Sequence, residues 1–390
     1  MSLARSRIAT FERPSLLQRI APMLDFDGPL LVAVLLLAGA GLVTMYSAGY
    51  DHGTRFVDHA RNMLLAGGVM FVVAQLPPQQ LQRLAVPLYV LGVSLLVAVA
   101  VFGVTKKGAT RWLHVGVVDI QPSEMLKIAT PLMLAWWFQR REGQLRAPDF
   151  AVAFVLLALP VGLVVKQPDL GTAILVLSAG LYVMFFAGLS WRLIVPVVAV
   201  GAAGIVALVI YGGDACQPGV KWPGLHDYQK HRVCTLLDPT TDPLGKGFHI
   251  IQGMIAIGSG GTTGKGFMNG TQTHLEFIPE RTTDFIFAAF SEEFGLIGCI
   301  GLLLGFTFLI FRGLMISAEA PTLFSRLLGG AITLGFFTYA MVNMGMVSGI
   351  LPVVGVPLPF ISYGGTAMVT LGLGLGILMS ISRSRRLMQS

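Results

Sequence analysis

Charged side chains are scarce in this sequence of 390 residues. Only 12% of the residues are Asp, Glu, Lys or Arg, whereas 54% are hydrophobic and the mean hydropathy is +0.73. A soluble globular protein carries about 25% charged residues, so the shortage argues against an ordinary soluble protein. It favours a protein with many membrane-spanning helices, in which a net charge of +7 reports membrane topology rather than nucleic-acid binding.

Cysteine is also rare, because three residues are too few for a disulfide scaffold. Cys299 lies in an apolar stretch, where simple packing accounts for it. Cys216 and Cys234 share one long polar segment, and they would pair if that segment lies outside the cytoplasm. Two free thiols are the alternative, and the sequence leaves both possibilities open.

Long apolar runs fill most of the chain, and no cleavable signal peptide precedes them. The first 27 residues are polar, and the next run is long enough to span a membrane, so we expect a retained first helix. We predict an all-α integral membrane protein of about ten transmembrane helices. The expected spans are 28–48, 62–76, 84–103, 122–139, 150–165, 170–187, 192–211, 284–311, 326–348 and 358–381.

The domain organisation follows from these runs. We expect a cytoplasmic tail at 1–27, one membrane domain at 28–382 and a second tail at 383–390. A large extracytoplasmic loop, 212–283, separates helices 7 and 8. With the N-terminus inside, fourteen Arg residues fall on the inner side and seven Lys or Arg residues on the outer side, outside the long loop. This bias predicts that both termini are cytoplasmic.

Acidic residues gather at the predicted outer face. Glu124, Asp169 and Asp284 each stand near the start of an even-numbered helix, and these helices run from outside to inside. Acids in a first helical turn commonly cap backbone N–H groups. With Arg111 and Lys127 nearby in sequence, they also fit a shared polar cavity that binds phosphate.

The long loop contains two further segments of interest. Residues 249–258 are apolar but too short to span, so we expect an interfacial or re-entrant segment. The glycine-rich stretch 258–266 fails the phosphate-binding loop pattern at Ser259 and Gly266. We interpret it as a flexible loop whose backbone can approach a ligand.

Seven segments, in this order, resemble the SEDS family of polytopic membrane glycosyltransferases, and most closely its RodA branch. They run from Lys107 to Gly365, whereas the first 100 residues match only in hydropathy. The Cys216 and Cys234 pair is not part of the family pattern. The segments are Lys107–Trp112, Gln121–Lys127, Gln167–Thr172, Asp238–Gly245, Gln252–Gly266, Glu280–Phe287 with Glu292 and Glu293, and Pro359–Gly365.

The resemblance implies an activity, a substrate and partners. Family members polymerise lipid II, a polyprenyl-diphosphate-linked disaccharide-pentapeptide, into glycan strands at the outer face of the bacterial inner membrane. The RodA branch acts in cell elongation with a class B penicillin-binding protein transpeptidase and other elongation-complex membrane proteins. The family's catalytic Asp corresponds to Asp284.

A mechanism follows as a hypothesis. Asp284 would take the proton from a sugar hydroxyl that attacks a second lipid-linked sugar. A divalent cation, Mg²⁺ or Mn²⁺, held by the acids stays open as a helper for the leaving diphosphate. Glu124 and Lys127 stand three residues apart and would equally form a structural pair. We expect the substrate to be bound by Lys107, Arg111, Glu124, Lys127, Asp169, Arg232, Gln252 and Ser362.

Two other functions compete with this one. A lipid II flippase would also have many helices and intramembrane acids, but these acids cluster on one face and do not form a relay across the bilayer. A non-catalytic scaffold would tolerate any change at Asp284.

Overall fold

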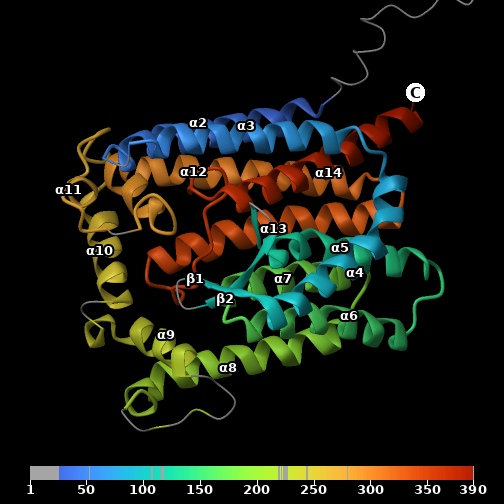
Figure 1. Ribbon diagram of the computed structural model, residues 1–390, viewed down its shortest axis with the longest axis horizontal. Coiled ribbons are helices and arrows are strands. Elements are labelled where there is room, and N and C mark those ends of the chain that lie inside the picture. The colour runs from blue at the N-terminus through green and yellow to red at the C-terminus, as the bar shows by residue number, and fades with distance from the viewer. Residues whose placement is uncertain are drawn as a thin grey trace, which may run out of the picture.

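The computed structural model describes residues 26–51, 53–106, 109–115, 118–217, 220, 222, 227–242, 245–278 and 280–389. Within these residues, ten helices of at least 17 residues run roughly along the long axis of the molecule (Figure 1). They are α2 (Gly28–Ala48), α3 (Arg55–Ala74), α4 (Pro78–Phe102), α5 (Pro122–Gln139), α6 (Ala147–Lys166), α7 (Leu170–Phe186), α8 (Trp191–Ala215), α12 (Ile286–Ala318), α13 (Leu323–Val347) and α14 (Gly365–Gln389).

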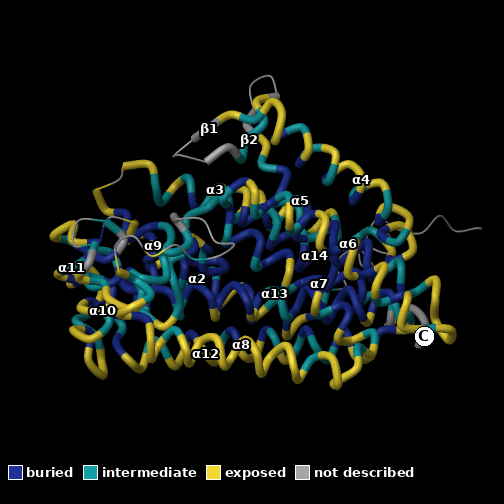
Figure 2. Tube along the Cα trace, turned by 90° about the horizontal axis from the view of Figure 1, so that it is seen from below, coloured by how far each residue is buried: buried dark blue, intermediate teal, exposed yellow. Residues whose placement is uncertain are grey.

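The predicted helical membrane fold is confirmed, with one long helix for each expected span. Eight of the described helices are long and apolar enough to cross a membrane by length and composition. The two exceptions, α5 and α7, pack against each other and against α13. Helix α7 is apolar but has only 17 residues, whereas α5 carries Glu124 and Lys127. Figure 2 shows buried residues concentrated in α7, α13 and α14.

Several predicted boundaries are wrong. The third helix begins at Pro78, not at residue 84, α12 ends at Ala318, not at residue 311, and α14 ends at Gln389, not at residue 381. The last helix begins at Gly365, not at residue 358, because Pro357 and Pro359 keep the preceding segment extended. The second helix begins at Arg55, not at residue 62. Its first turns carry Asp58 and Arg61, so they lie outside the apolar run from which the span was predicted.

A small antiparallel sheet, which was not predicted, joins α4 to α5. Its strands are β1 (Val104–Lys106), β2 (Ala109–Val115) and β3 (Val118–Ile120), in the order β1-β2-β3. The β-branched residues of this stretch were an available signal.

The bundle has two ends that differ in chemistry. At the tail end, where α2 begins and α14 finishes, Asp27 accepts hydrogen bonds from Arg312 Nε at 2.9 Å and Nη2 at 2.6 Å. The opposite, loop end carries α9 (Asp227–Leu237), η2 (Pro239–Thr241), α10 (Lys246–Ser259) and α11 (Thr271–His274). The predicted non-spanning segment 249–258 lies in α10, which has 14 residues and lies across the bundle end (Figure 1).

Helix α12 is broken near the loop end, where the sequence predicted a continuous helix. Gly295 has a φ of +62°, and residues 261–266 insert at the break. Leu296 N–H donates to the Gly261 carbonyl at 2.9 Å, and Gly266 N–H donates to the Glu293 carbonyl at 3.0 Å. The glycine-rich stretch therefore brings its backbone against a helix, where we had expected it to approach a ligand.

Glu292 fastens the same loop from inside α12. Its side chain is fully buried and accepts hydrogen bonds from Lys265 Nζ at 2.6 Å and from Gln272 N–H at 2.9 Å. Thr273 N–H donates to it as well, at 3.2 Å. Burial of a carboxylate requires such a set of donors. Glu292 is thus a structural residue of the loop end.

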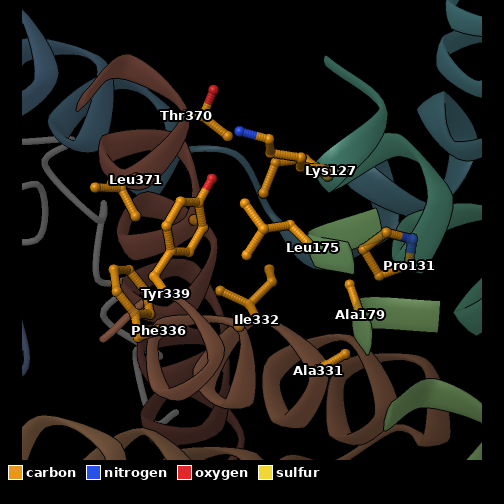
Figure 3. A pocket seen from close by; sticks show the side chains of 13 residues that line it. Lys127, Pro131, Leu175, Ala179, Ala331, Ile332, Phe336, Tyr339, Thr370 and Leu371 are labelled. Atoms are coloured by element: carbon orange, nitrogen blue, oxygen red, sulfur yellow. The ribbon is translucent and has the colours of Figure 1, made fainter. Parts of the chain in front are cut away.

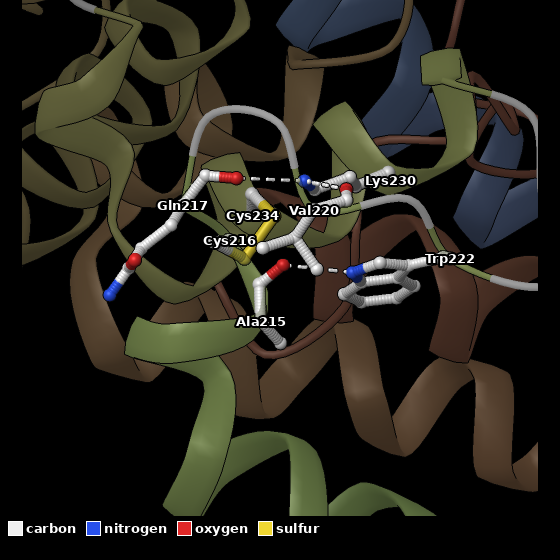
Figure 4. The surroundings of a disulfide bond; sticks show 7 residues. All are labelled: Ala215, Cys216, Gln217, Val220, Trp222, Lys230 and Cys234. Atoms are coloured by element: carbon white, nitrogen blue, oxygen red, sulfur yellow. Dashed lines mark hydrogen bonds between the residues drawn. A yellow bond between two sulfur atoms is a disulfide. The ribbon is translucent and has the colours of Figure 1, made fainter.

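Helix α8 stands apart from the bundle and is mostly exposed along its length. A disulfide between Cys216 and Cys234, with Cα atoms 5.6 Å apart, joins its end to α9 (Figure 4). Trp222 Nε1 also donates to the Ala215 carbonyl at 2.9 Å. Of the two possibilities left open by the sequence, the structure has the bonded pair, whereas Cys299 is a free thiol.

Replacing Gly295 by Ala should unfold the loop end at a lower temperature. A Cβ atom there would lie 2.2 Å from Gly264 N, at a φ that side chains rarely adopt. We expect a loss of about 2–5 kcal/mol of stability, measured by thermal denaturation in detergent. Gly301→Ala is the control, because a Cβ at that position of α12 meets no atom within 4 Å. Equal melting temperatures for the two variants would contradict the assignment of a tight break.

Removing the disulfide by Cys216→Ser with Cys234→Ser should loosen α9 selectively. The bond closes a sequence separation of 18 residues, for which chain-entropy models give about 3 kcal/mol. We expect faster amide hydrogen exchange in α9 and the end of α8, with exchange in α13 unchanged. Cys299→Ser serves as the control for loss of a thiol. Faster exchange throughout the bundle would show that the bond supports the whole fold instead.

Candidate functional site

Asp284 lies at the loop end, in the turn just before α12 begins, and is half-buried. Its backbone carbonyl accepts a hydrogen bond from Asn343 Nδ2 at 2.9 Å. The same Asn343 amide donates to the Val356 carbonyl at 2.8 Å, and its side chain is fully buried in α13. Asn343 therefore joins the Asp284 turn to the 351–364 loop that precedes α14.

Ser362 makes a second connection between the same two segments. Its hydroxyl donates to the Thr283 carbonyl at 2.7 Å and accepts from Leu358 N–H at 2.8 Å. Next to it, Tyr363 N–H donates to the Thr282 carbonyl at 2.8 Å. Ser362 is only 2% exposed. Ser362, which we predicted to contact the substrate, thus lies beneath Asp284 and fixes the backbone next to it.

The 351–364 loop passes between Asp284 and the start of α7. A Cβ atom at Gly355 would lie 3.3 Å from Asp284 Oδ2, and this glycine has a φ of +75°. A Cβ atom at Gly171, in the first turn of α7, would lie 2.8 Å from the Val354 carbonyl. Small residues on both sides therefore let the loop lie close to the carboxylate.

Helix α10 covers another side of the Asp284 turn. A Cβ atom at Gly253 would lie 3.2 Å from the Phe285 ring, and the His249 ring centroid lies 5.7 Å from that of Phe285. Gln252, predicted to bind substrate, is the partly exposed neighbour of Gly253. Arg232 lies in α9, which packs on α8, η2 and α10. Lys107 lies outside the described residues.

Asp169 caps α7 and is the centre of a polar cluster. Its carboxylate accepts from Thr172 N–H at 3.2 Å and from Gln121 Nε2 at 3.1 Å. Arg111 Nη1 lies 3.7 Å from Asp169 Oδ1, and its Nη2 donates to the Pro168 carbonyl at 2.6 Å. The capping interpretation is therefore correct, and Arg111 is directed to the same helix start.

Glu124 and Lys127 form the pair that their spacing predicted, with Lys127 Nζ 2.6 Å from Glu124 Oε1. Thr370 of α14 donates to Glu124 at 3.2 Å, and Lys127 Nζ lies 5.3 Å from the Tyr339 ring centroid. Figure 3 shows Lys127 directed toward Thr370 and Tyr339 above an apolar cavity of about 40 Å³. Side chains of three helices thus meet around one buried ion pair.

Two residues of the site were missed. Asn343 lies in an apolar helix, where its polar side chain was an unused signal. Arg281 belongs to a segment that we did single out, yet we gave it no role. It is 3% exposed, pairs with Asp51, and donates to the Ala48 carbonyl at 3.0 Å. Arg281 therefore joins the end of α2 to the Asp284 turn.

A metal centre does not emerge from the described part of the chain, where no three His, Cys, Asp or Glu side chains come together as ligands. A divalent cation, Mg²⁺ or Mn²⁺, stays a prediction, because Mg²⁺ is commonly held by one or two carboxylates together with substrate phosphates. Asp284 itself is suited to accepting a proton, because it is a half-exposed carboxylate on a backbone fixed from two sides.

Known proteins resemble this chain in both sequence and fold. The chain is 48% identical to the peptidoglycan glycosyltransferase MrdB of Escherichia coli K12 over 360 residues, which are 92% of this chain and 94% of that protein. A chain from a structure titled "Structural coordination of polymerization and crosslinking by a peptidoglycan synthase complex" matches with a TM-score of 0.75 and 32% identity, over 93% of this chain and 99% of that one. The rod shape determining protein RodA of Thermus thermophilus matches with a TM-score of 0.67 and 28% identity, over 93% and 98% of the two chains. The family model for FtsW, RodA and SpoVE, described as cell cycle protein, covers residues 29–387. This multi-pass membrane protein belongs to the FtsW, RodA and SpoVE family.

Proposed function

We propose that the protein is a peptidoglycan glycosyltransferase that polymerises lipid II during cell elongation, with Asp284 as general base. The observation that carries the proposal is the fixed backbone of Asp284 at the loop end. The names of similar proteins support the reaction class, because MrdB of E. coli and RodA of Treponema pallidum, 32% identical to this chain, are both peptidoglycan glycosyltransferases.

The proposed step moves one proton and one sugar. The 4-hydroxyl oxygen of one lipid-linked unit bonds to the anomeric carbon of another, and its proton passes to Asp284. The bond from that carbon to the diphosphate breaks, and the polyprenyl diphosphate leaves with the electron pair. A positioned carboxylate contributes about 10²–10⁴-fold to such a step. The transfer of the hydroxyl proton to Asp284 does not itself require a metal ion.

An apolar groove supports a lipid-linked substrate. It has a volume of about 580 Å³ and lies between α2, α3 and α14. Its side chains are apolar throughout, from Leu31 and Leu42 on α2 to Met63 and Met70 on α3. Such a groove fits a polyprenyl chain, because its apolar side chains pack against a hydrocarbon and leave no polar group without a partner.

The orientation is part of the proposal. We assign the loop end to the outer face of the bacterial inner membrane and both termini to the cytoplasm. The Arg bias of the inner loops supports this assignment. The disulfide at the loop end supports it independently, because disulfides persist in oxidising compartments.

A crosslinking partner fits this function. The similar chain noted above comes from a peptidoglycan synthase complex that coordinates polymerization and crosslinking. We propose that this protein likewise works with a class B penicillin-binding protein transpeptidase, together with other membrane proteins of cell elongation.

A flippase is less well supported. Asp169 stands at the start of α7, where Gly171 lies against the same loop as Asp284, while the cavity beneath Lys127 is small and lined mainly by apolar residues. A transporter needs a polar route that continues across the bilayer. Glycan product from externally supplied lipid II would indicate a polymerase, and transbilayer movement without product would indicate a flippase.

Replacing Asp284 by Asn should abolish glycan synthesis from purified lipid II. The amide keeps the shape of the side chain but does not accept the proton, so we expect a loss of at least about 100-fold. Asp214→Asn, an exposed acid at the end of α8, is the matched control and should retain activity. Full activity of the Asp284 variant, with normal elution from a sizing column, would remove the general base from the proposal.

Asn343→Leu should impair turnover without impairing substrate binding, because Asn343 positions the Asp284 backbone. We expect kcat to fall about 10–100-fold, since a small displacement of a catalytic group is costly, while KM changes less than about twofold. Asn269→Leu removes an exposed loop amide and serves as the control. A rise in KM with kcat preserved would show that Asn343 shapes a binding surface instead.

A further inference from the structure

The cations at the described site are already engaged with protein groups. Lys127 pairs with Glu124 at 2.6 Å, and Arg111 donates to the Gln167 and Pro168 carbonyls. A polyprenyl diphosphate needs positive charge that is available to it. A cation without a protein counter-ion is therefore better suited to bind the phosphate.

Arg55, the first residue of α3, is such a cation. Its guanidinium carbon lies 4.5 Å from the Tyr363 ring centroid, and among the described residues no carboxylate pairs with it. The ring holds the guanidinium in place through a cation–π contact and leaves its N–H donors unused. Arg55 is partly exposed, so a ligand can reach it.

His59 lies one turn further along α3 and flanks the same tyrosine. Its ring centroid lies 6.4 Å from that of Tyr363. The side chain is fully buried, and its ring lies against the backbone of Phe360. His59 therefore packs beside Tyr363 and helps to fix the ring on which Arg55 lies.

The two residues stand between the Asp284 turn and the apolar groove. Tyr363 N–H donates to the Thr282 carbonyl at 2.8 Å. The residue whose ring contacts Arg55 is therefore hydrogen-bonded to the Asp284 turn. Phe360 and Ala60 are the groove residues nearest in sequence to Tyr363 and His59. From Ala60 the groove follows α3 as far as Met70, which is about 15 Å of helix.

We propose that Arg55, assisted by His59, binds the phosphate of a polyprenyl phosphate or diphosphate whose chain lies in the groove. This inference rests on the proposed function and names a binding site for its substrate or released lipid. The guanidinium would donate two parallel hydrogen bonds to phosphate oxygens, and the buried His59 ring would support Tyr363, on which the guanidinium lies. The lipid would then hold its sugar end near Asp284.

The test measures lipid binding separately from catalysis. Purified wild type, Arg55→Gln and Arg61→Gln are titrated with undecaprenyl phosphate in detergent, and KM for lipid II is measured in parallel. Arg61 is the matched control, because it lies on the same helix, pairs with Asp58 at 3.0 Å and has a side chain that is 67% exposed. We expect Arg55→Gln to weaken binding about tenfold and to raise KM, as the loss of one charge-assisted contact predicts. Arg61→Gln should match the wild type.

A second variant and a second lipid make the result decisive. His59→Phe keeps an aromatic ring beside Tyr363, and it should weaken binding less than Arg55→Gln does. Phosphatidylglycerol carries the phosphate on shorter acyl chains and should compete poorly. Equal binding by Arg55→Gln and Arg61→Gln would overturn the site, and equal competition by phosphatidylglycerol would overturn the polyprenyl assignment. A wild type that binds undecaprenyl phosphate through Arg55 but makes no glycan would refute the proposed function and not the site.

Discussion

The structure of the loop end depends on hydrogen bonds to backbone carbonyls that lie beyond the ends of the helices. The turn at 282–284 offers three carbonyls that belong to no helix, and Tyr363 N–H, Ser362 Oγ and Asn343 Nδ2 each donate to one of them. Unpaired backbone groups at membrane depth are costly, so these three hydrogen bonds fix the turn. This backbone sets the position of the Asp284 carboxylate. A shift of the loop before α14 would therefore also move the carboxylate.

The break in α12 solves the same problem in a second place. Ending a helix at Gly295 frees N–H and carbonyl groups on both sides, and residues 261–266 supply the missing partners from outside the helix. Glu292 then satisfies the N–H groups at the start of α11, while its charge is balanced by Lys265. Irregular backbone is tolerated here because protein surrounds it. The two arrangements together make the loop end one cross-linked layer on top of the helices.

Sequence reasoning predicted those features that depend on neighbours along the chain. Apolar runs gave ten helices, and the i,i+3 spacing gave the Glu124–Lys127 pair. Sequence reasoning did not predict contacts between residues that are distant along the chain. Nothing near Ser362 in sequence indicates that its hydroxyl donates to the Thr283 carbonyl, because only the fold brings the two segments together. The break in α12 was not predicted for the same reason, because residues 261–266, which insert there, belong to a separate segment of the sequence.

Ion pairs within the described bundle provide the context for Arg55. Asp27 with Arg312, Glu124 with Lys127 and Glu292 with Lys265 show that ionic groups here are matched within the protein. Pairing of this kind is the rule for charges near a membrane, because an isolated charge is expensive. Arg55 instead lies on the Tyr363 ring, about one helical turn before Ala60, a residue of the apolar groove. Its counter-charge is therefore best sought in a molecule that brings a phosphate and a long hydrocarbon chain together.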